Sequence, residues 1–481
     1  MNIQATPKKP VVAIVGSGIS GLVCAYLLRQ HYDVHLFESQ ANFGGHTATT
    51  QVKLNDQIYP VNTGFIVYND WTYPHFIQLM DELGVATEAS DMSFSVKCDV
   101  SGMEYNGQDI NSLFARRQNL INPSFWRMIL DILRFNRETR SEIEAHNRNE
   151  DQFDPTETLG SYLKRKRYGD YFRRYYIIPM GAAIWSSGET SMMEFPVLFF
   201  LRFFNNHGLL SVNDRPQWRV ISGGSQTYVR ALLSHLPQEQ LHTNTAVTSI
   251  KRDEEGIKLT LKDTSQESLT SLTGDLKPQD RQFEADHVIL ACHSDQALAM
   301  LEQATPDEQR ILGAIPYQDN SVILHTDSSL LPVNKRAWAS WNYHMDSGDD
   351  HTVAVTYHMN RLQNFHEAPE EFCVTLNQPE AIDPRKIIKR FNYAHPVFTV
   401  EGIQAQHQHH LISNHSSTHQ RTHYCGAYWF NGFHEDGVNS ALRVCRELGV
   451  QWPPRQGTST PYTNISEPSV AADVKTAELG Q

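Results

Sequence analysis

Residues 11–21 read VVAIVGSGISG, and the next apolar run, VHLFE at residues 34–38, ends at Glu38. The first stretch is a short apolar strand that leads into Gly16-x-Gly18-x-x-Gly21 and then into an apolar-periodic segment. Gly16 permits a tight turn, Gly18 lets the backbone approach a pyrophosphate, and Gly21 lets helix and strand pack closely. Glu38 follows the first glycine by about 20 residues, where a carboxylate accepts hydrogen bonds from a ribose hydroxyl. The pattern predicts a dinucleotide site, with an ordinary structural turn as the alternative.

The composition is that of a globular protein with more than one domain. The chain has 481 residues, of which 40% are hydrophobic and 20% charged, and its formal net charge is −13. An acidic balance argues against a nucleic-acid partner, because phosphate binding needs a basic face. The six cysteines are scattered and form no CxxC pair. This spacing predicts reduced thiols in a reducing compartment and no metal site.

Targeting and membrane signals are weak. The first ten residues, MNIQATPKKP, contain no signal-peptide core. The chain has no run of about 18 apolar residues, so we expect no transmembrane segment. The longest apolar stretch, residues 195–204, favours a buried helix over an acyl tunnel lining or a segment that dips into a bilayer. We expect a cytoplasmic protein, with peripheral contact at the inner face of a membrane left open.

Three glycine elements lie far apart in the sequence, at residues 16–21, 44–45 and 432–437. NAD needs only the first element, whereas the longer FAD needs further close approaches of the backbone. Gly437 and Val438 are expected to open the last helix, whose free N–H groups would stabilise negative charge on a reduced flavin. The alternative is a plain helix start capped by Asp436. The three elements together predict FAD.

The order of segments predicts an α/β fold with a Rossmann-like FAD-binding domain and a second substrate domain of helices and antiparallel sheet. Both domains are expected to be discontinuous. Residues 9–70, 215–300 and 420–452 are assigned to the FAD-binding domain, and residues 71–214 and 301–419 to the substrate domain. The tail, residues 453–481, is rich in Pro, Ser and Thr and is expected to be disordered.

The chain resembles the FAD-dependent amine oxidase and phytoene desaturase superfamily. GSGISG, Glu38, FGGHT, ISGGSQT, ADHVILA and GFHEDGV stand in the order of that superfamily. It is more closely similar to the flavoprotein region at the N-terminus of plant cyclopropane fatty acid synthases and its stand-alone bacterial relatives. The stretches that carry this closer resemblance include SDMSFSV, NPSFW, RPQW, AWASWN, VTLN and CGAYWFNGFHEDG, between about Val11 and Leu448.

The resemblance implies an FAD-dependent oxidoreductase with non-covalent FAD. It places Glu38 on the ribose, Val247 beside the adenine through its backbone, and His46 near the flavin. The full predicted cofactor-binding set is Gly16, Ser17, Gly18, Ile19, Ser20, Gly21, Glu38, Gly44, Gly45, His46, Thr63, Gly64, Val247, Gly426, Glu435, Asp436, Gly437 and Val438. No catalytic residue is identified beyond the candidate His434, for which a structural role is the alternative.

Two positions depart from the superfamily pattern. Amine oxidases usually carry a lysine in the strand written here as DNSVILH, and this chain has Ser321 at that place. This departure puts amine oxidation in doubt. Gly426 is followed by Ala427 where related families have an acid, so a ribityl contact would pass to Asp436 or Glu435.

The leading hypothesis is hydride removal from a carbon centre of an apolar substrate, an acyl chain or lipid, by a desaturase or oxidase active in fatty acid modification. The first alternative is a flavin amine oxidase. The second is a non-catalytic flavin-binding partner of a lipid methyl transferase. A basic run near Arg173 is read mainly as a solvated helix surface, with a lipid headgroup site as the alternative.

Overall fold

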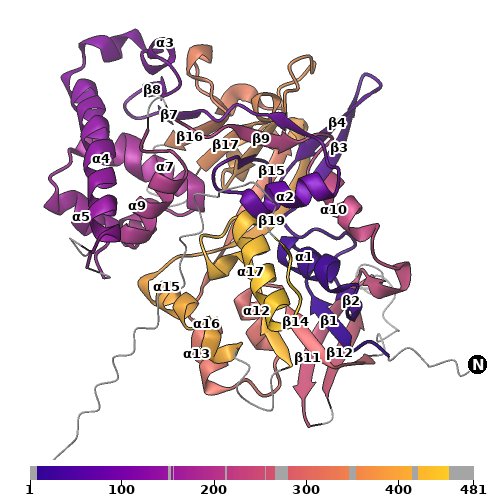
Figure 1. Ribbon diagram of the computed structural model, residues 1–481. Coiled ribbons are helices and arrows are strands. Elements are labelled where there is room, and N and C mark those ends of the chain that lie inside the picture. The colour runs from indigo at the N-terminus through magenta and orange to yellow at the C-terminus, as the bar shows by residue number, and fades with distance from the viewer. Residues whose placement is uncertain are drawn as a thin grey trace, which may run out of the picture.

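A five-stranded parallel sheet gathers strands from the start, middle and end of the chain (Figure 1). The structure, a computed structural model, describes residues 8–149, 153–154, 156–211, 214–254, 256–265, 280–345, 354–413 and 421–453. The sheet order is β10 (Leu241–His242), β2 (Asp33–Phe37), β1 (Val11–Val15), β14 (His287–Leu290) and β20 (Thr422–Tyr424). Its central strand β1 reads VVAIV and is apolar along its length because both faces are covered.

Helices cover one face of this sheet and a small antiparallel sheet covers the other. The first face carries α1 (Ile19–Leu28), α10 (Gln226–Leu233) and α17 (His434–Glu447), whose apolar side chains pack on β1 and β2. The second face carries β11 (Thr245–Arg252), β12 (Ile257–Asp263) and β13 (Arg281–Ala285), with α12 (Ser294–Met300) and α13 (Pro306–Gly313). This is the Rossmann-like layering that the sequence predicts.

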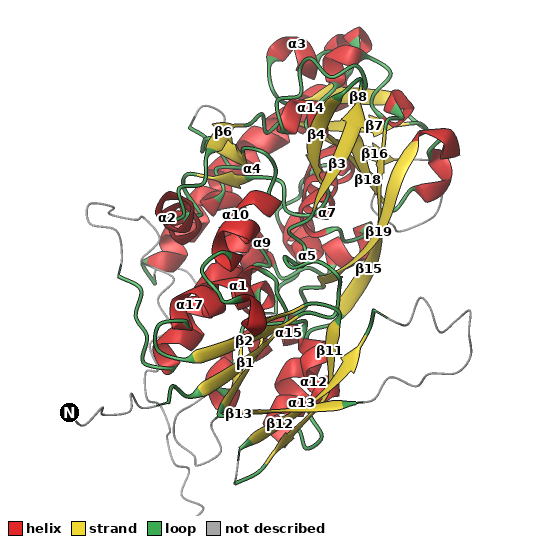
Figure 2. Cartoon of the chain, turned by 90° about the vertical axis from the view of Figure 1, so that its right-hand side faces the viewer, coloured by secondary structure: helices red, strands yellow, loops and turns green. Residues whose placement is uncertain are grey.

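A second, seven-stranded sheet forms the other half of the molecule (Figure 2). Its order is β19 (Ile387–Pro396), β15 (Tyr317–His325), β18 (Cys373–Leu376), β17 (Ala354–His358), β16 (Trp341–Met345), β7 (Phe94–Cys98) and β8 (Met103–Asn106). Only β16 and β7 are parallel neighbours, so the expected antiparallel sheet is mixed at this one contact.

Smaller elements link the two sheets. They are the hairpin β3 (Thr49–Leu54) and β4 (Gln57–Asn62), the sheet of β5 (Tyr68–Asn69), β9 (Trp218–Ile221) and β6 (Thr87–Ala89), and the helices α2 (Pro74–Glu82), α14 (Met359–Leu362), α15 (Val400–His407) and α16 (His409–Ile412). The hairpin brings the segment after the second glycine element against β9 and α10, through Asn62, which accepts from Ser225 N.

A lobe of helices extends from the large sheet, at the upper left of Figure 1. It contains α3 (Ile110–Leu113), the 3₁₀ turn η1 (Arg117–Ile121), α4 (Pro123–Asn147), α5 (Leu159–Arg165), α6 (Asp170–Phe172), α7 (Ile178–Trp185), α8 (Glu189–Met193) and α9 (Val197–Asn206). The Asn122 side chain caps α4 by accepting from Ser124 N and Phe125 N, and Pro123 occupies the first turn, where proline needs no N–H partner.

The apolar stretch 195–204 forms most of α9, and its Phe200, Leu201 and Phe204 side chains are buried in the lobe. The buried-helix interpretation is confirmed for these side chains, whereas Phe199 of the same stretch is only partly buried. The fold class is confirmed as well, whereas the domain boundaries given above remain predictions. The predicted disordered tail lies outside the described residues except for Pro453. No helix in the described ranges is long and apolar enough to cross a membrane.

Candidate functional site

The three glycines of the first element have three different environments. Gly16 has φ +101°, and a Cβ there would lie 2.9 Å from the Ala291 carbonyl oxygen. A Cβ on Gly21 would lie 2.0 Å from the Gly16 carbonyl oxygen, so only glycine lets α1 approach the turn. A Cβ on Gly18 would meet no atom within 4 Å. Open space therefore lies in front of α1, at the place where the sequence predicts a pyrophosphate.

The N-terminus of α1 is prepared for an anion. Gly18 is its N-cap and offers no side chain to the first N–H groups, and the first turn contains no acidic residue. Free N–H groups and the positive end of the helix dipole thus face the open space beside Gly18.

Glu38 is held at the carboxyl end of β2, beside this turn. Its Oε2 accepts hydrogen bonds from Ser17 N at 3.2 Å and Ser17 Oγ at 2.6 Å, and its Oε1 accepts from Gln40 N at 2.9 Å. Ser17 Oγ also accepts from Gly44 N at 3.0 Å. A Cβ on Gly45 would lie 3.1 Å from Gly18 Cα. The first and second glycine elements therefore meet around Ser17.

The third glycine element packs against the first. Ser20 Oγ donates to the Gly437 carbonyl oxygen at 3.0 Å, and a Cβ on Gly437 would lie 2.5 Å from Ile19 Cγ2. Val438 is fully buried in the same contact between α1 and α17. All three glycine elements, remote in sequence, thus lie at one place.

The start of the last helix differs from the prediction. α17 begins at His434, three residues before Gly437, and Gly437 N donates to the Phe433 carbonyl oxygen at 3.0 Å. The N–H group of Gly437 is therefore used within the helix and is not free for a flavin. Asp436 accepts from Phe433 N at 2.9 Å, and burial raises the pKa of its carboxyl to about 7.

Glu435 is occupied by another helix. Its two carboxylate oxygens accept from His75 N at 3.0 Å and Phe76 N at 2.8 Å, at the start of α2, and His75 Nδ1 lies 2.8 Å from Oε1. These contacts cap α2 and argue against the predicted ribityl contact of Glu435.

His46, Thr63 and Gly64 form one backbone contact. Phe65 N donates to the His46 carbonyl oxygen at 2.8 Å, and a Cβ on Gly64 would lie 1.9 Å from that oxygen. Thr63 N donates to the Ala48 carbonyl oxygen at 3.0 Å. The Nε2 atom of His46 is buried without a hydrogen-bond partner among the described residues. Such an orphaned polar atom fits a polar cofactor group.

The candidate His434 belongs to a small buried network. Its ring stacks on Phe65 with centroids 3.5 Å apart, and its Nε2 lies 3.0 Å from Thr47 Oγ1 and 2.9 Å from the Tyr228 hydroxyl. Burial lowers the pKa of His434 to about 3, so its imidazole is neutral at physiological pH. The partners Thr47, Phe65 and Tyr228 were not predicted, although Thr47 and Phe65 directly follow predicted site residues.

The sequence also did not predict a cluster of imidazole rings around His46. The His46 ring lies 6.0 Å from His293, 5.5 Å from His395 and 5.0 Å from Tyr393. These rings come from the loop after β14 and from β19, and burial lowers the pKa of His46 to about 3 and of His395 to about 4. Uncharged rings of β19, in the large sheet, therefore lie next to His46 of the second glycine element.

Gly426 and Val247 lie near the carboxyl edge of the parallel sheet, and Ser321 lies in the seven-stranded sheet. Gly426 follows β20, and its N–H donates to Ser440 Oγ at 2.6 Å. Val247 is buried in β11, the strand that begins where Thr245 N donates to the Glu38 carbonyl oxygen at 2.8 Å. Ser321 lies on β15, and its N–H donates to Asn377 Oδ1 at 3.0 Å.

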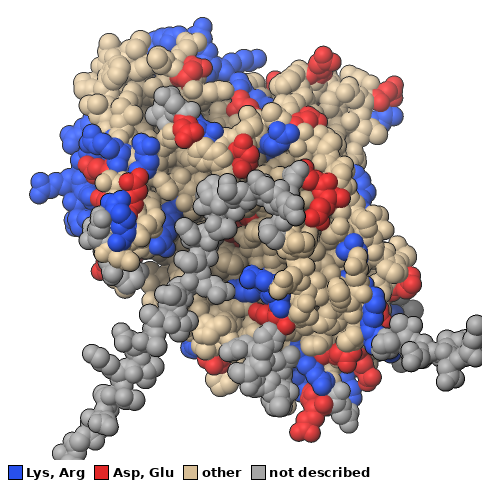
Figure 3. Space-filling model, in the orientation of Figure 1, with Lys and Arg blue, Asp and Glu red and all other residues tan. Residues whose placement is uncertain are grey.

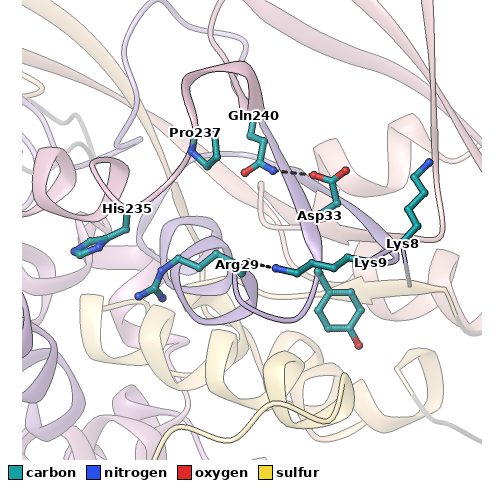
Figure 4. A pocket seen from close by; sticks show the side chains of 8 residues that line it. Lys8, Lys9, Arg29, Asp33, His235, Pro237 and Gln240 are labelled. Atoms are coloured by element: carbon teal, nitrogen blue, oxygen red, sulfur yellow. Dashed lines mark hydrogen bonds between the residues drawn. The ribbon is translucent and has the colours of Figure 1, made fainter. Parts of the chain in front are cut away.

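A surface cavity lies at the other edge of this sheet (Figure 4). Lys9 precedes β1 and Asp33 begins β2, so the cavity is at the amino ends of these strands, opposite Gly16 and Glu38. Ligands of parallel α/β sheets bind at the carboxyl ends, so this cavity is separate from the glycine elements. No group of described His, Cys, Asp and Glu side chains is arranged to hold a metal ion.

The glycine elements meet at the carboxyl edge of a Rossmann-like sheet, and the sequence over residues 19–449 matches the family of flavin-containing amine oxidoreductases. The chain belongs to this family. No curated protein sequence matches the flavoprotein.

Three solved structures share its fold. The cyclohexylamine oxidase of Brevibacterium oxydans is 15% identical, with 92% of this chain and 100% of that chain covered and a TM-score of 0.61. A putrescine oxidase bound to putrescine is 15% identical, with 92% and 99% covered and a TM-score of 0.59. A fatty acid isomerase from P. acnes that produces CLA is 15% identical, with 93% and 100% covered and a TM-score of 0.62. At such identities the likeness establishes the fold alone.

The flavoprotein is an FAD-dependent oxidoreductase. FAD supplies the acceptor for a hydride when it is bound. The residues present fit this cofactor: the first N–H groups of α1 border the open space at Gly18, where they would hold the pyrophosphate, Glu38 beside this turn would hold the ribose, and the buried His46 Nε2, which has no partner among the described residues, would accept a hydrogen bond from the cofactor or donate one to it.

Proposed function

We propose that the flavoprotein oxidises an apolar substrate, an acyl chain or lipid, by loss of a hydride from one of its carbon centres. The observation that carries this proposal is a row of aromatic rings between the helical lobe and the last glycine loop. Phe433 directly precedes His434, and its ring stacks on Phe203 of α9 with centroids 5.0 Å apart. Phe199 of the same helix stacks on Phe398 at 5.1 Å.

The electrostatics of this region favour an uncharged substrate. His207 stacks on Phe203 at 3.8 Å, and burial lowers its pKa to about 4, so it stays neutral at physiological pH. An alkyl chain gains free energy in such a dehydrated aromatic surround, whereas an ammonium group needs a carboxylate or a ring cage to offset its desolvation. Ser321, in place of the lysine usual in amine oxidases, supports the same choice. One structural neighbour, the isomerase from P. acnes, acts on a fatty acid.

Amine oxidation remains the second candidate function, because the family is named for it and because a cyclohexylamine oxidase and a putrescine oxidase share the fold. The lipid proposal includes a closer relation to the flavoprotein region of plant cyclopropane fatty acid synthases and, with it, a lipid methyl transferase as partner. It also includes a cytoplasmic location.

The basic run near Arg173 is a poor headgroup site, since Arg173 pairs with Glu189 at 2.8 Å and Arg165 pairs with Glu157 at 2.7 Å.

The deciding experiment is anaerobic mixing of the FAD-loaded protein with candidate substrates while the flavin absorbance is followed. Unsaturated or methyl-branched acyl lipids should bleach the flavin within the mixing experiment, and common mono- and polyamines should not. Readmission of oxygen, or addition of another electron acceptor, should restore the colour. Rapid bleaching by an amine, with none by any acyl lipid, would overturn the lipid proposal and establish the second candidate.

A further inference from the structure

Exposed apolar side chains gather at the tip of the helical lobe. Eight of the eleven large hydrophobic side chains that are exposed among the described residues lie there. They are Val100, Ile110, Leu120, Ile121, Trp126, Leu130, Leu133 and Val333, and we call them the lobe patch. Ile121 and Val333 are each 84% exposed and Leu130 is 65% exposed. Such a concentration of apolar side chains in water marks an interaction surface more often than chance exposure does.

The segments that carry the patch are tied to one another by hydrogen bonds. Arg116 donates to the Ser101 carbonyl oxygen at 2.8 Å and thereby ties the turn with Val100 to α3 and η1. Val333 N donates to Glu104 Oε1 at 2.7 Å, and Asn334 Nδ2 donates to the Ala115 carbonyl oxygen at 2.6 Å. These bonds fix the loop with Val333 beside α3.

Helix α4 has two apolar faces, and only one of them is used by the fold. Phe125, Met128 and Phe135 are fully buried in the lobe. Trp126, Leu130 and Leu133, at the i, i+4 and i+7 positions, point outward. Trp126 Nε1 donates to the Leu120 carbonyl oxygen at 2.9 Å, which leaves the indole as an apolar surface with its polar atom satisfied. A second apolar stripe of this kind is not needed for the core.

The charge around the patch is opposite to that of the whole chain. Residues 110–137 contain five arginines and one aspartate, and together with Lys335 and Arg336 these arginines outnumber Asp99, Glu104, Asp109 and Asp131 around the patch, while the chain carries a net charge of −13. Lys335 and Arg336 are exposed two and three residues after Val333. Figure 3 shows Lys and Arg side chains gathered over the helical lobe. Apolar side chains with a tryptophan, surrounded by arginines, are typical of helices that lie in a membrane interface.

We infer that the lobe patch docks the protein on a bilayer of anionic phospholipids. A second copy of this chain is a poorer occupant, because a two-fold interface would place the same arginines against each other. The inference does not rest on the acyl-lipid proposal, since a docked protein could act on any substrate. It assigns membrane contact to α3, η1 and α4, whereas the sequence offered membrane contact only as the alternative interpretation of residues 195–204 and of the run near Arg173.

The test is flotation of the FAD-loaded protein with vesicles of phosphatidylcholine alone or of equal parts phosphatidylcholine and phosphatidylglycerol. The wild-type protein should float with the mixed vesicles and lose binding at high salt. The double variant Ile121→Ser/Leu130→Ser should lower the partition coefficient at least tenfold. Arg127→Ala/Arg137→Ala should remove the preference for the anionic vesicles.

Ile58→Ser is the control, because Ile58 is 58% exposed, close to the 65% of Leu130, and lies on strand β4 of the hairpin, away from the lobe. Unchanged flavin content of every variant shows that the fold is intact. Wild-type protein that does not float, or a double variant that floats as well as the control, would overturn the inference. A dimer in gel filtration that the double variant abolishes, without vesicle binding, would assign the patch to a second copy instead. Flavin reduction by a detergent-dispersed substrate reports on the proposed function separately.

Discussion

At the scale of single residues, the glycines of the nucleotide turn separate cofactor binding from folding. Gly18 has φ −62° and ψ 177°, which any residue adopts, and a Cβ there meets no protein atom within 4 Å. Gly18→Val should therefore leave the unfolding free energy of the apoprotein within about 0.5 kcal/mol of wild type and abolish FAD binding. Denaturant unfolding and flavin absorbance measure the two effects.

Gly21→Val is the matched variant, because its side chain would collide with the Gly16 carbonyl oxygen. It should lower the unfolding free energy by at least about 3 kcal/mol as well as abolish FAD binding. A Gly18→Val protein with full flavin content would mean that the cofactor lies elsewhere.

The buried histidines predict how stability depends on pH. The pKa of His434 in the folded protein is about 3, below the value of about 6.5 in an unfolded chain. Between these values the unfolded state binds the proton and the folded state does not, so His434 destabilises the fold as pH falls below 6.5. Between pH 6.5 and pH 5, His434 lowers the unfolding free energy by about 1–2 kcal/mol.

His434→Gln should therefore make the unfolding free energy fall less steeply with decreasing pH over this range. The measurement is urea unfolding at several pH values, with the exposed His31→Gln as control. Asp436 changes the unfolding free energy in the opposite direction. Its raised pKa stabilises the folded state at low pH, and this stabilisation is lost as pH rises through about 7. Identical slopes for His434→Gln and wild type would show that His434 does not remain neutral in the folded protein.

Sequence reasoning at this scale succeeds where the spacing along the chain is itself the physical constraint. The roles of Gly16 and Gly21 follow from a tight turn and a close helix, and both appear in the structure as predicted. His293 and His395 could not be predicted as neighbours of His46, because the sheet edges that bring them together are set by long-range packing.

At the scale of elements, Glu435 joins the last helix to α2. Its carboxylate accepts from His75 N and Phe76 N, so Glu435→Ala would leave two N–H groups at the start of α2 without this acceptor. We expect a loss of about 2 kcal/mol in unfolding free energy with little change in FAD affinity. Urea unfolding and FAD titration of the apoprotein measure these quantities, and Glu435→Gln should recover part of the stability. Weaker FAD binding at unchanged stability would restore the ribityl role that the sequence suggested.

Helix boundaries were predictable where a cap is written in the sequence and not where the start is atypical. Asn122-Pro123 marks the start of α4 correctly. The sequence predicts a start of α17 at Gly437, because glycine and the preceding acid resemble a helix beginning, whereas in the structure Phe433 precedes the first residue of the helix and Asp436 accepts from its N–H. Gly437 is needed for contact with Ile19, which only the packing of α17 on α1 reveals.

At the scale of the whole molecule, the order of nucleotide-fold and other segments was enough to predict a Rossmann-like domain and a second domain. The sequence could not show that α4 has an exposed apolar face, because the same periodicity describes its buried face. Nor could it show that the basic run at residues 164–174 is partly neutralised, since its partners Glu142 and Glu189 lie in other helices and Glu157 lies in the irregular segment before α5.

The contact between the helical lobe and the last glycine loop provides a final prediction, which rests on the proposed substrate. Phe203 and Phe433 stack at 5.0 Å across this contact. Phe203→Leu and Phe433→Leu should each lower the second-order rate constant of flavin reduction by an acyl lipid about tenfold. Because the two rings form one surface, the double variant should lose little more than the worse single variant. Stopped-flow reduction of the FAD-loaded variants measures this coupling, and flavin occupancy controls for damage to the cofactor site. Losses that multiply would mean that the rings act separately, and unchanged rates would place the acyl chain away from this contact.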